Sequence, residues 1–199
     1  MMFKLKYRIF EEKSDMQGND LDLLEEQSSI YGFISLKFNE EEIGYIIEED
    51  EAPSPEDINC EMYLYHDNLT WWFETLLEVL NLLERNMYVR FQVLESADRW
   101  VSFEKNGSNL IVIFFNYFDL GGNIVSLDKI TSNSKIDECI EIIDFNNFQK
   151  ELITSTYKFI QEVADINQKL LNTNRFHNLC QKLMNFKEFK LEICWKMNI

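Results

Sequence analysis

Two histidines and four cysteines are among the side chains that could bind a metal ion or act in nucleophilic catalysis, together with carboxylates as metal ligands and serines as nucleophiles. His177 and Cys180 lie three residues apart in a segment predicted to be helical, so they share a face, and Glu61 and His66 flank a predicted turn. A metal site needs several converging ligands, and neither pair has a second pair nearby at ligand spacing. We therefore predict ordinary core and surface roles for these residues, and neither a metal nor a cofactor.

Sequence motifs for catalysis are also missing. The chain has no GxSxG, no phosphate-binding loop and no GxGxxG, and its adjacent glycines Gly121 and Gly122 indicate a turn. Acidic residues are so numerous that closeness in sequence does not identify an acid–base pair. An unrecognised hydrolase that uses carboxylates with His66 or His177 remains an alternative. It requires a deep pocket that gathers a histidine with two or more acids.

Acidic charge is concentrated in the first third of the chain. The formal net charge is −16, and residues 1–61 hold 17 acidic and 5 basic side chains, a net charge of −12. Two runs stand out: Glu40, Glu41 and Glu42 in a predicted hairpin connection, and Glu48, Glu49, Asp50 and Glu51 in a predicted loop that holds both prolines. The strand expected between them spans about 17 Å, so the runs lie at opposite ends of it.

These seven residues have two interpretations. Clustered acidic charge accelerates association with a basic partner and can occupy a site built for phosphate. The alternative is a solvated surface that keeps the protein soluble. We select Glu40, Glu41, Glu42, Glu48, Glu49, Asp50 and Glu51 as the candidate partner-binding residues.

A basic strip, Lys4, Lys6 and Arg8, interrupts this acidic region. It indicates either an anion site or cations that protect a strand edge and offset nearby acids. The overall charge disfavours nucleic-acid binding. The longest apolar stretch, 110–115, is far shorter than the roughly 20 residues that cross a bilayer. Without a predicted signal peptide, we expect a cytoplasmic protein with reduced thiols and no membrane association.

The hydropathy pattern predicts which elements position these residues. Strict alternation predicts strands at 3–10, 30–38 and 43–47, joined by a connection at 39–42. A helix begins near Asp67 or Asn68, with a wide apolar stripe. Within it, Trp71 and Trp72 either form a ligand platform or, as we favour, Trp72 packs in the core and Trp71 is partly buried.

The second half of the chain predicts a β meander and further helices. Asn106 and Gly107 suit a two-residue hairpin turn, which would pair Phe103 with Leu110. Short strands are possible at 123–127 and 139–143. A long helix is expected over 146–171, capped by Asn146 or Asn147. A short helix at 175–185 and a last strand at 189–195 follow.

Adjacent strands with short turns predict an α+β fold, with a mainly antiparallel sheet, a central amphipathic helix and C-terminal helices. The length of 199 residues suits a single domain over 1–199. Its parts are an acidic β-rich region at 1–61, a helix and meander at 62–130, and a helical region with the last strand at 131–199.

The stretch NLTWWFETLLEVLNLLERNMYVRFQVLESADRWVSFEKNGSNLIV, residues 68–112, resembles part of a class of small acidic bacterial proteins. These are immunity proteins encoded beside polymorphic or contact-dependent toxins, and the resemblance covers about residues 30–170. It implies a cytosolic protein with high affinity for one toxin domain and no catalysis of its own. We therefore expect a non-catalytic acidic inhibitor of a basic toxin domain. A homo-oligomer that associates through exposed aromatic residues is a further alternative.

Overall fold

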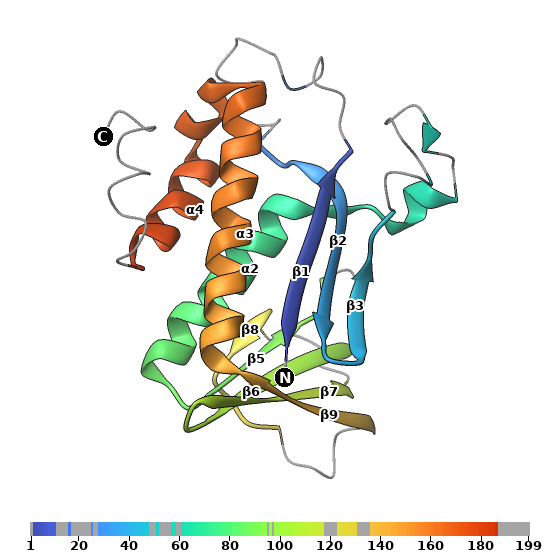
Figure 1. Ribbon diagram of the computed structural model, residues 1–199, viewed down its shortest axis with the longest axis vertical. Helices are drawn as coiled ribbons and strands as arrows, with labels where there is room; N and C mark the ends of the chain where they lie inside the picture. Colours follow the sequence, from blue (N-terminus) through green and yellow to red (C-terminus); the bar gives the residue numbers. More distant parts are fainter. Residues whose placement is uncertain are drawn as a thin grey trace.

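The computed structural model describes residues 2–10, 16, 25, 28–47, 51, 57–58, 61–94, 96, 98–117, 123–130 and 136–186. These residues form antiparallel sheets and helices, which confirms the α+β prediction (Figure 1). In chain order the elements are β1 (Phe3–Ile9), β2 (Tyr31–Phe38), β3 (Glu41–Tyr45), η3 (Met62–Tyr65), β4 (Asp67–Asn68), α2 (Leu69–Arg85), β5 (Tyr88–Gln92), β6 (Arg99–Asn106), β7 (Asn109–Asn116), β8 (Val125–Ser126), β9 (Ile136–Asp144), α3 (Phe145–Ile166), η5 (Gln168–Asn172) and α4 (Asn174–Met184).

Sheet A has the order β1-β2-β3, with β4 paired to β2. The alternating pattern located all three main strands, but the connection between β2 and β3 is shorter than predicted. Phe38 pairs with Glu41, so the turn is Asn39 and Glu40 alone and β3 begins at Glu41 rather than residue 43. Asn39 makes this tight turn possible because it adopts a φ of 53°, which asparagine tolerates better than most residues.

Sheet B has the order β8-β5-β6-β7-β9 and contains the predicted meander. The predicted turn is wrong by one residue: Asn106 pairs with Asn109, and the loop is Gly107 and Ser108. Gly107 has a φ of 62°, and a glycine in this first position suits a hairpin turn. The loop also contacts the start of α3, because Phe145 N donates a hydrogen bond to Ser108 O at 2.9 Å. Because of the shifted turn, Phe103 pairs with Val112 rather than Leu110, a shift of two residues that keeps every side chain on its predicted face.

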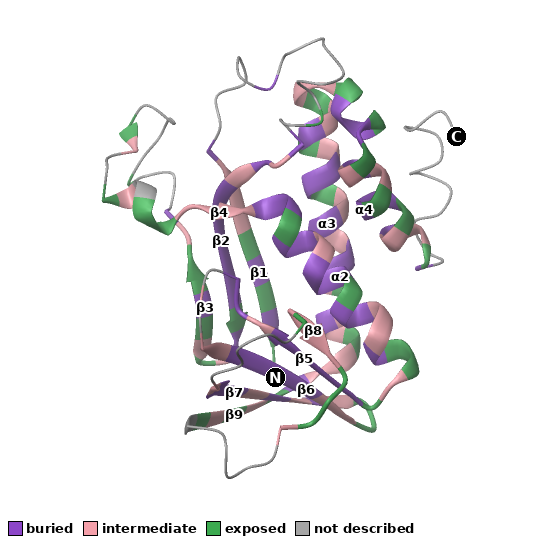
Figure 2. Ribbon diagram, turned by 180° about the vertical axis from the view of Figure 1, so that it is seen from behind, coloured by how far each residue is buried: buried purple, intermediate pink, exposed green. Residues whose placement is uncertain are grey.

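Helix α2 begins as predicted, because the Asn68 side chain accepts a hydrogen bond from Trp71 N at 3.0 Å. Trp72 is 1 % exposed and lies in the core, whereas Trp71 is 36 % exposed. The main core surrounds α2 and includes residues of both sheets and of α3, η5 and α4, and a second, small cluster contains Phe10, Phe33 and Ile47 (Figure 2).

Helix α3 differs from its predicted bounds at both ends. Its N-cap is Asp144, whose carboxylate accepts from Asn147 N at 2.7 Å, rather than Asn146 or Asn147. It ends at Ile166 instead of residue 171, because the Asn167 side chain caps the separate turn η5 and donates to Met16 O at 2.8 Å. Helix α4 matches the predicted short helix within a residue.

Sheet A and sheet B meet at the lower end of the view in Figure 1. Helix α3 runs along the edge of β1, α2 passes behind sheet A, and sheet B lies across the end of sheet A. Several predictions fall outside the described residues: Glu48, Glu49 and Asp50, most of the loop at 11–28, the glycine turn at 121–122 and the strand at 189–195. Within the part that the structure describes, no helix is long and apolar enough to cross a membrane.

Candidate functional site

The turn between β2 and β3 lies against the edge strand of sheet B. Asn39 Nδ2 donates to Glu141 Oε2 at 2.7 Å and to Ile142 O at 3.0 Å on β9. The backbone and side chain of Asn39 also exchange hydrogen bonds with Met2, which precedes β1. These contacts place the first predicted acidic run, Glu40 to Glu42, beside β9.

The three glutamates of this run have different surroundings. Glu40 is exposed. Glu42 lies opposite Lys37 on β2, and its carboxylate accepts a hydrogen bond from Ser35 Oγ. Glu41 is half-buried and lies beside the thiol of Cys139 on β9.

The pKa of the Cys139 thiol reflects the negative charge of the nearby carboxylates, where the β2–β3 turn meets β9. Desolvation is the largest cause of its raised pKa, and the carboxylates of Glu41 and Glu141 raise that pKa further. Carboxylates from two distant segments therefore lie around one point. Together with exposed Glu138, they form an acidic edge on β9.

Four isoleucines lie on the outer face of sheet B together with Glu138, whereas Cys139 and Glu141 of the same edge strand point to the opposite face, toward the hairpin. The register pairs Ile111 with Ile142 and Ile113 with Ile140. Ile140 is 58 % exposed and Ile142 is 43 % exposed, although both lie on an edge strand. Exposed apolar side chains with a polar rim are typical of protein interaction sites. We name the set Glu40, Glu41, Glu138, Glu141, Ile111, Ile113, Ile140 and Ile142 the hairpin–β9 surface.

The second acidic run does not join this surface in the described residues. Ile47, just before the run, accepts a hydrogen bond from Arg8 Nη1 at 3.2 Å, and Arg8 pairs with Phe33. The hairpin turn follows Phe38, five residues beyond Phe33, so the turn and the start of the second acidic run are about 17 Å apart along β2. Glu51 is exposed, and Glu48, Glu49 and Asp50 lie outside the described residues.

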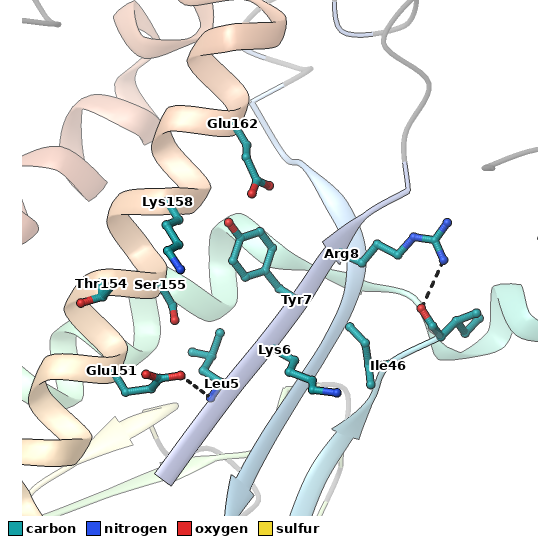
Figure 3. Close-up of a pocket in the computed structure, with 11 residues that line it drawn as sticks. Leu5, Lys6, Tyr7, Arg8, Ile46, Glu151, Thr154, Ser155, Lys158 and Glu162 are labelled. Atoms are coloured by element: carbon teal, nitrogen blue, oxygen red, sulfur yellow. Dashed lines mark hydrogen bonds between the residues drawn. The ribbon is translucent and has the colours of Figure 1, made fainter. Parts of the chain in front are cut away.

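A second feature is an open pocket of about 610 Å³ along β1 (Figure 3). Two members of the predicted basic strip, Lys6 and Arg8, line it, and Lys158 of α3 adds a third cation. Its other lining residues are Leu5, Tyr7, Ile46, Ile47, Glu151, Thr154, Ser155 and Glu162. Sequence reasoning missed the residues contributed by α3, which the predicted helix carries as polar positions at steps of three and four.

The two carboxylates of the pocket do not form a hydrolase pair. Glu151 and Glu162 are eleven residues apart on α3, about 16 Å along the helix axis. Paired glycosidase carboxylates are about 5–10 Å apart. Among the described residues that line the pocket, none is a histidine.

Tyr7 and Glu162 face one another across this pocket. Desolvation raises the pKa of Glu162, against the opposing effects of the Tyr7 hydroxyl and of Lys158. Burial and the Glu162 charge raise the pKa of Tyr7. The hydroxyl is therefore a neutral hydrogen-bonding group near neutral pH.

Both histidines and Cys180 lie among the described residues, each in contact with other side chains or in the core. The His66 ring lies 5.6 Å from the rings of Phe10 and of Tyr31, and His177 Nε2 lies 2.8 Å from Gln181 Nε2. Cys180 is fully buried, and burial raises the pKa of its thiol to about 12. The described residues contain no group of three or more His, Cys, Asp or Glu side chains that could hold a metal ion.

Comparison of the chain with protein-family models, with curated proteins and with solved structures finds no match.

Proposed function

We propose that this chain is a non-catalytic acidic binding protein of the immunity type, which binds a basic toxin domain and neutralises it through the hairpin–β9 surface. The observation that carries the proposal is the meeting of acidic and exposed apolar side chains at one edge. Glu40 and Glu41 come from the charged first third, whereas Glu141 and the isoleucines come from sheet B.

The chemistry of this surface favours a basic protein as partner. The carboxylates attract and orient a positively charged surface, which increases the association rate. The isoleucines supply apolar area that becomes buried in a complex and lowers the dissociation rate. A small ion would use only the first of these properties.

A second copy of the chain fits this surface poorly. A symmetric dimer uses the same surface of both copies, so it would bring the carboxylates of Glu40, Glu41, Glu138 and Glu141 from both copies into one interface. Like charges at an interface oppose association. This argues against the homo-oligomer alternative at this site.

The test uses the protein encoded by the gene adjacent to the one for this chain. We expect that it is toxic when expressed alone in bacteria, that co-expression of this chain restores growth, and that the two proteins elute together in size-exclusion chromatography. Loss of rescue in a variant with Glu40→Lys and Glu138→Lys would support the surface assignment.

A charge-matched control separates this surface from general acidity. Glu84→Lys combined with Asp165→Lys also replaces two exposed acids, on α2 and α3. We expect this control to rescue growth as the unchanged protein does. A non-toxic neighbour that forms no complex with the chain, or equal rescue by both double variants, would contradict the proposal.

A further inference from the structure

The free edge of β1 is covered by side chains in place of a neighbouring strand. Among the described residues, β2 is the one strand that pairs with β1 in sheet A. Phe10 N donates to Tyr31 O at 3.4 Å, in the same register as the rest of the β1–β2 pair. Residues at even positions of β1 therefore direct their backbone N–H groups toward β2, and odd positions direct theirs toward α3.

Helix α3 supplies acceptors to the first of these outward N–H groups. Phe3 N donates to Asn147 Oδ1 at 2.8 Å, and Leu5 N donates to Glu151 Oε1 at 3.3 Å. Four residues of helix rise about 6 Å, and two residues of strand rise about 6.7 Å. This near match allows successive turns of α3 to satisfy successive outward groups of β1.

The series of side-chain acceptors from α3 ends before Tyr7. The next position on α3 is Ser155, whose side chain is shorter than those of Asn147 and Glu151. Among the described residues, no group accepts a hydrogen bond from Tyr7 N. The pocket lies here, so the outward N–H and C=O of Tyr7 border a cavity of about 610 Å³.

The groups around this backbone position are suited to a carboxylate. Lys158 extends from α3 into the space beside β1, above Ser155 (Figure 3). Lys6 and Arg8 line the pocket on the other side of the strand. A backbone N–H, a hydroxyl and an ammonium are donors that recognise a carboxylate. Three cations against two carboxylates give the pocket a positive balance in a chain of net charge −16.

We infer that this pocket binds an extended peptide that pairs with β1 at Tyr7 and places a carboxylate beside Lys158. Pairing of a peptide with an exposed strand edge is a general mode of recognition, in which the backbone supplies hydrogen bonds and the side chains supply specificity. Leu5 and Ile46 provide apolar contacts on either side. The volume is in the range of small-ligand pockets, which limits the bound segment to a few residues. This site is separate from the hairpin–β9 surface and does not depend on the proposed function.

The experiment uses the peptide acetyl-Val-Thr-Val-Glu with a free C-terminal carboxylate, titrated into the isotopically labelled full chain and followed by heteronuclear NMR. We expect saturable binding, with the amide proton of Tyr7 moving downfield as it gains a hydrogen bond. The uncharged peptide acetyl-Val-Thr-Val-Gln-amide should bind at least about tenfold more weakly. An unmoved Tyr7 amide, or equal affinity for the uncharged peptide, would overturn the inference.

Two further peptides distinguish the source of the carboxylate. Acetyl-Val-Thr-Val-Gln with a free C-terminus keeps only the terminal group, and acetyl-Val-Thr-Val-Glu-amide keeps only the side-chain group. Tight binding of either one supports the inference and identifies the source. If neither binds more tightly than the uncharged peptide, the inference is overturned.

Matched variants on α3 locate the binding site. Lys158→Glu should weaken binding of the charged peptide at least about tenfold, whereas Lys150→Glu, at another exposed lysine of the same helix, should leave binding unchanged. Equal affinity of the two variants would contradict the inference. The double variant Glu40→Lys with Glu138→Lys should bind the peptide normally, so a failure of the proposed toxin binding is distinguishable from a failure here.

Discussion

At the scale of single residues, Asn39 connects the two sheets. It holds a positive φ at the β2–β3 turn, and its side chain contacts Met2, Glu141 and Ile142. A short amide is suited to both tasks, because it tolerates the left-handed region and carries a donor and an acceptor. Asn39 therefore helps to hold Glu40 and Glu41 beside β9, together with the packing of Phe38 on Phe103 and Phe114.

Substitution of Asn39 separates the backbone requirement from the hydrogen bonds. Asn39→Ala loses both, and we expect it to lower the free energy of unfolding by about 2–3 kcal/mol. Asn39→Gly keeps the backbone conformation and should cost only about 1 kcal/mol. Urea denaturation measures both values, and equal losses for the two variants would contradict the backbone contribution.

Glu74 on α2 predicts a pH dependence of stability. Desolvation raises its pKa, although Arg175 and Lys182 act in the opposite direction. The folded state then binds the proton more tightly than the unfolded state, whose glutamate pKa is about 4.3. This group therefore favours folding at low pH, and that contribution is lost as the pH rises from about 4.3 through the raised folded-state value.

Replacement by glutamine removes this titration. Glu74→Gln should raise the free energy of unfolding, relative to the unchanged protein, by more at pH 7 than at pH 4. Urea denaturation at both pH values measures the difference. A difference that is the same at both pH values would show that burial does not control this carboxyl.

At the scale of elements, local patterns predicted the strands of sheet A, the start of α2 and the extent of α4. Alternation and an N-cap are properties of neighbouring residues. The turn was placed one residue early because Asn106 and Gly107 also suit a two-residue hairpin turn. The cap at Asp144 was missed because the nearby Asn146 and Asn147 are residues of equal N-cap preference. The polar positions of α3 that serve the edge of β1 could not be recognised without the strand beside them.

The two capping assignments for α3 have different consequences. Asp144→Ala removes the side chain that accepts from Asn147 N, and we expect a loss of about 1 kcal/mol in the free energy of unfolding. Asn146→Ala, at the exposed residue that the sequence suggested, should change it by less than about 0.5 kcal/mol. Thermal or urea denaturation measures both losses. A larger loss for Asn146→Ala than for Asp144→Ala would favour Asn146 as the N-cap of α3.

At the scale of the whole molecule, part of the acidic charge of residues 1–61 lies beside the edge strand of sheet B. The candidates Glu40, Glu41 and Glu42 could be named from sequence because the run is conspicuous. Glu141 and the four isoleucines could not, since their place is set by the pairing of β7 with β9 and by Asn39. Residues of the acidic first third and residues of sheet B therefore contribute to one surface.

The central claim is that the hairpin–β9 surface captures a basic partner. The most direct test is the association rate constant with the neighbouring gene's product, measured by stopped flow at about 50 mM and 500 mM salt. The account predicts a rate that falls with salt, because the Debye length shortens from more than 10 Å to a few ångströms. It also predicts a slower rate and a weaker salt dependence for the double variant Glu40→Lys with Glu138→Lys than for the control Glu84→Lys with Asp165→Lys. Identical rates and salt dependences for the two variants would contradict the account.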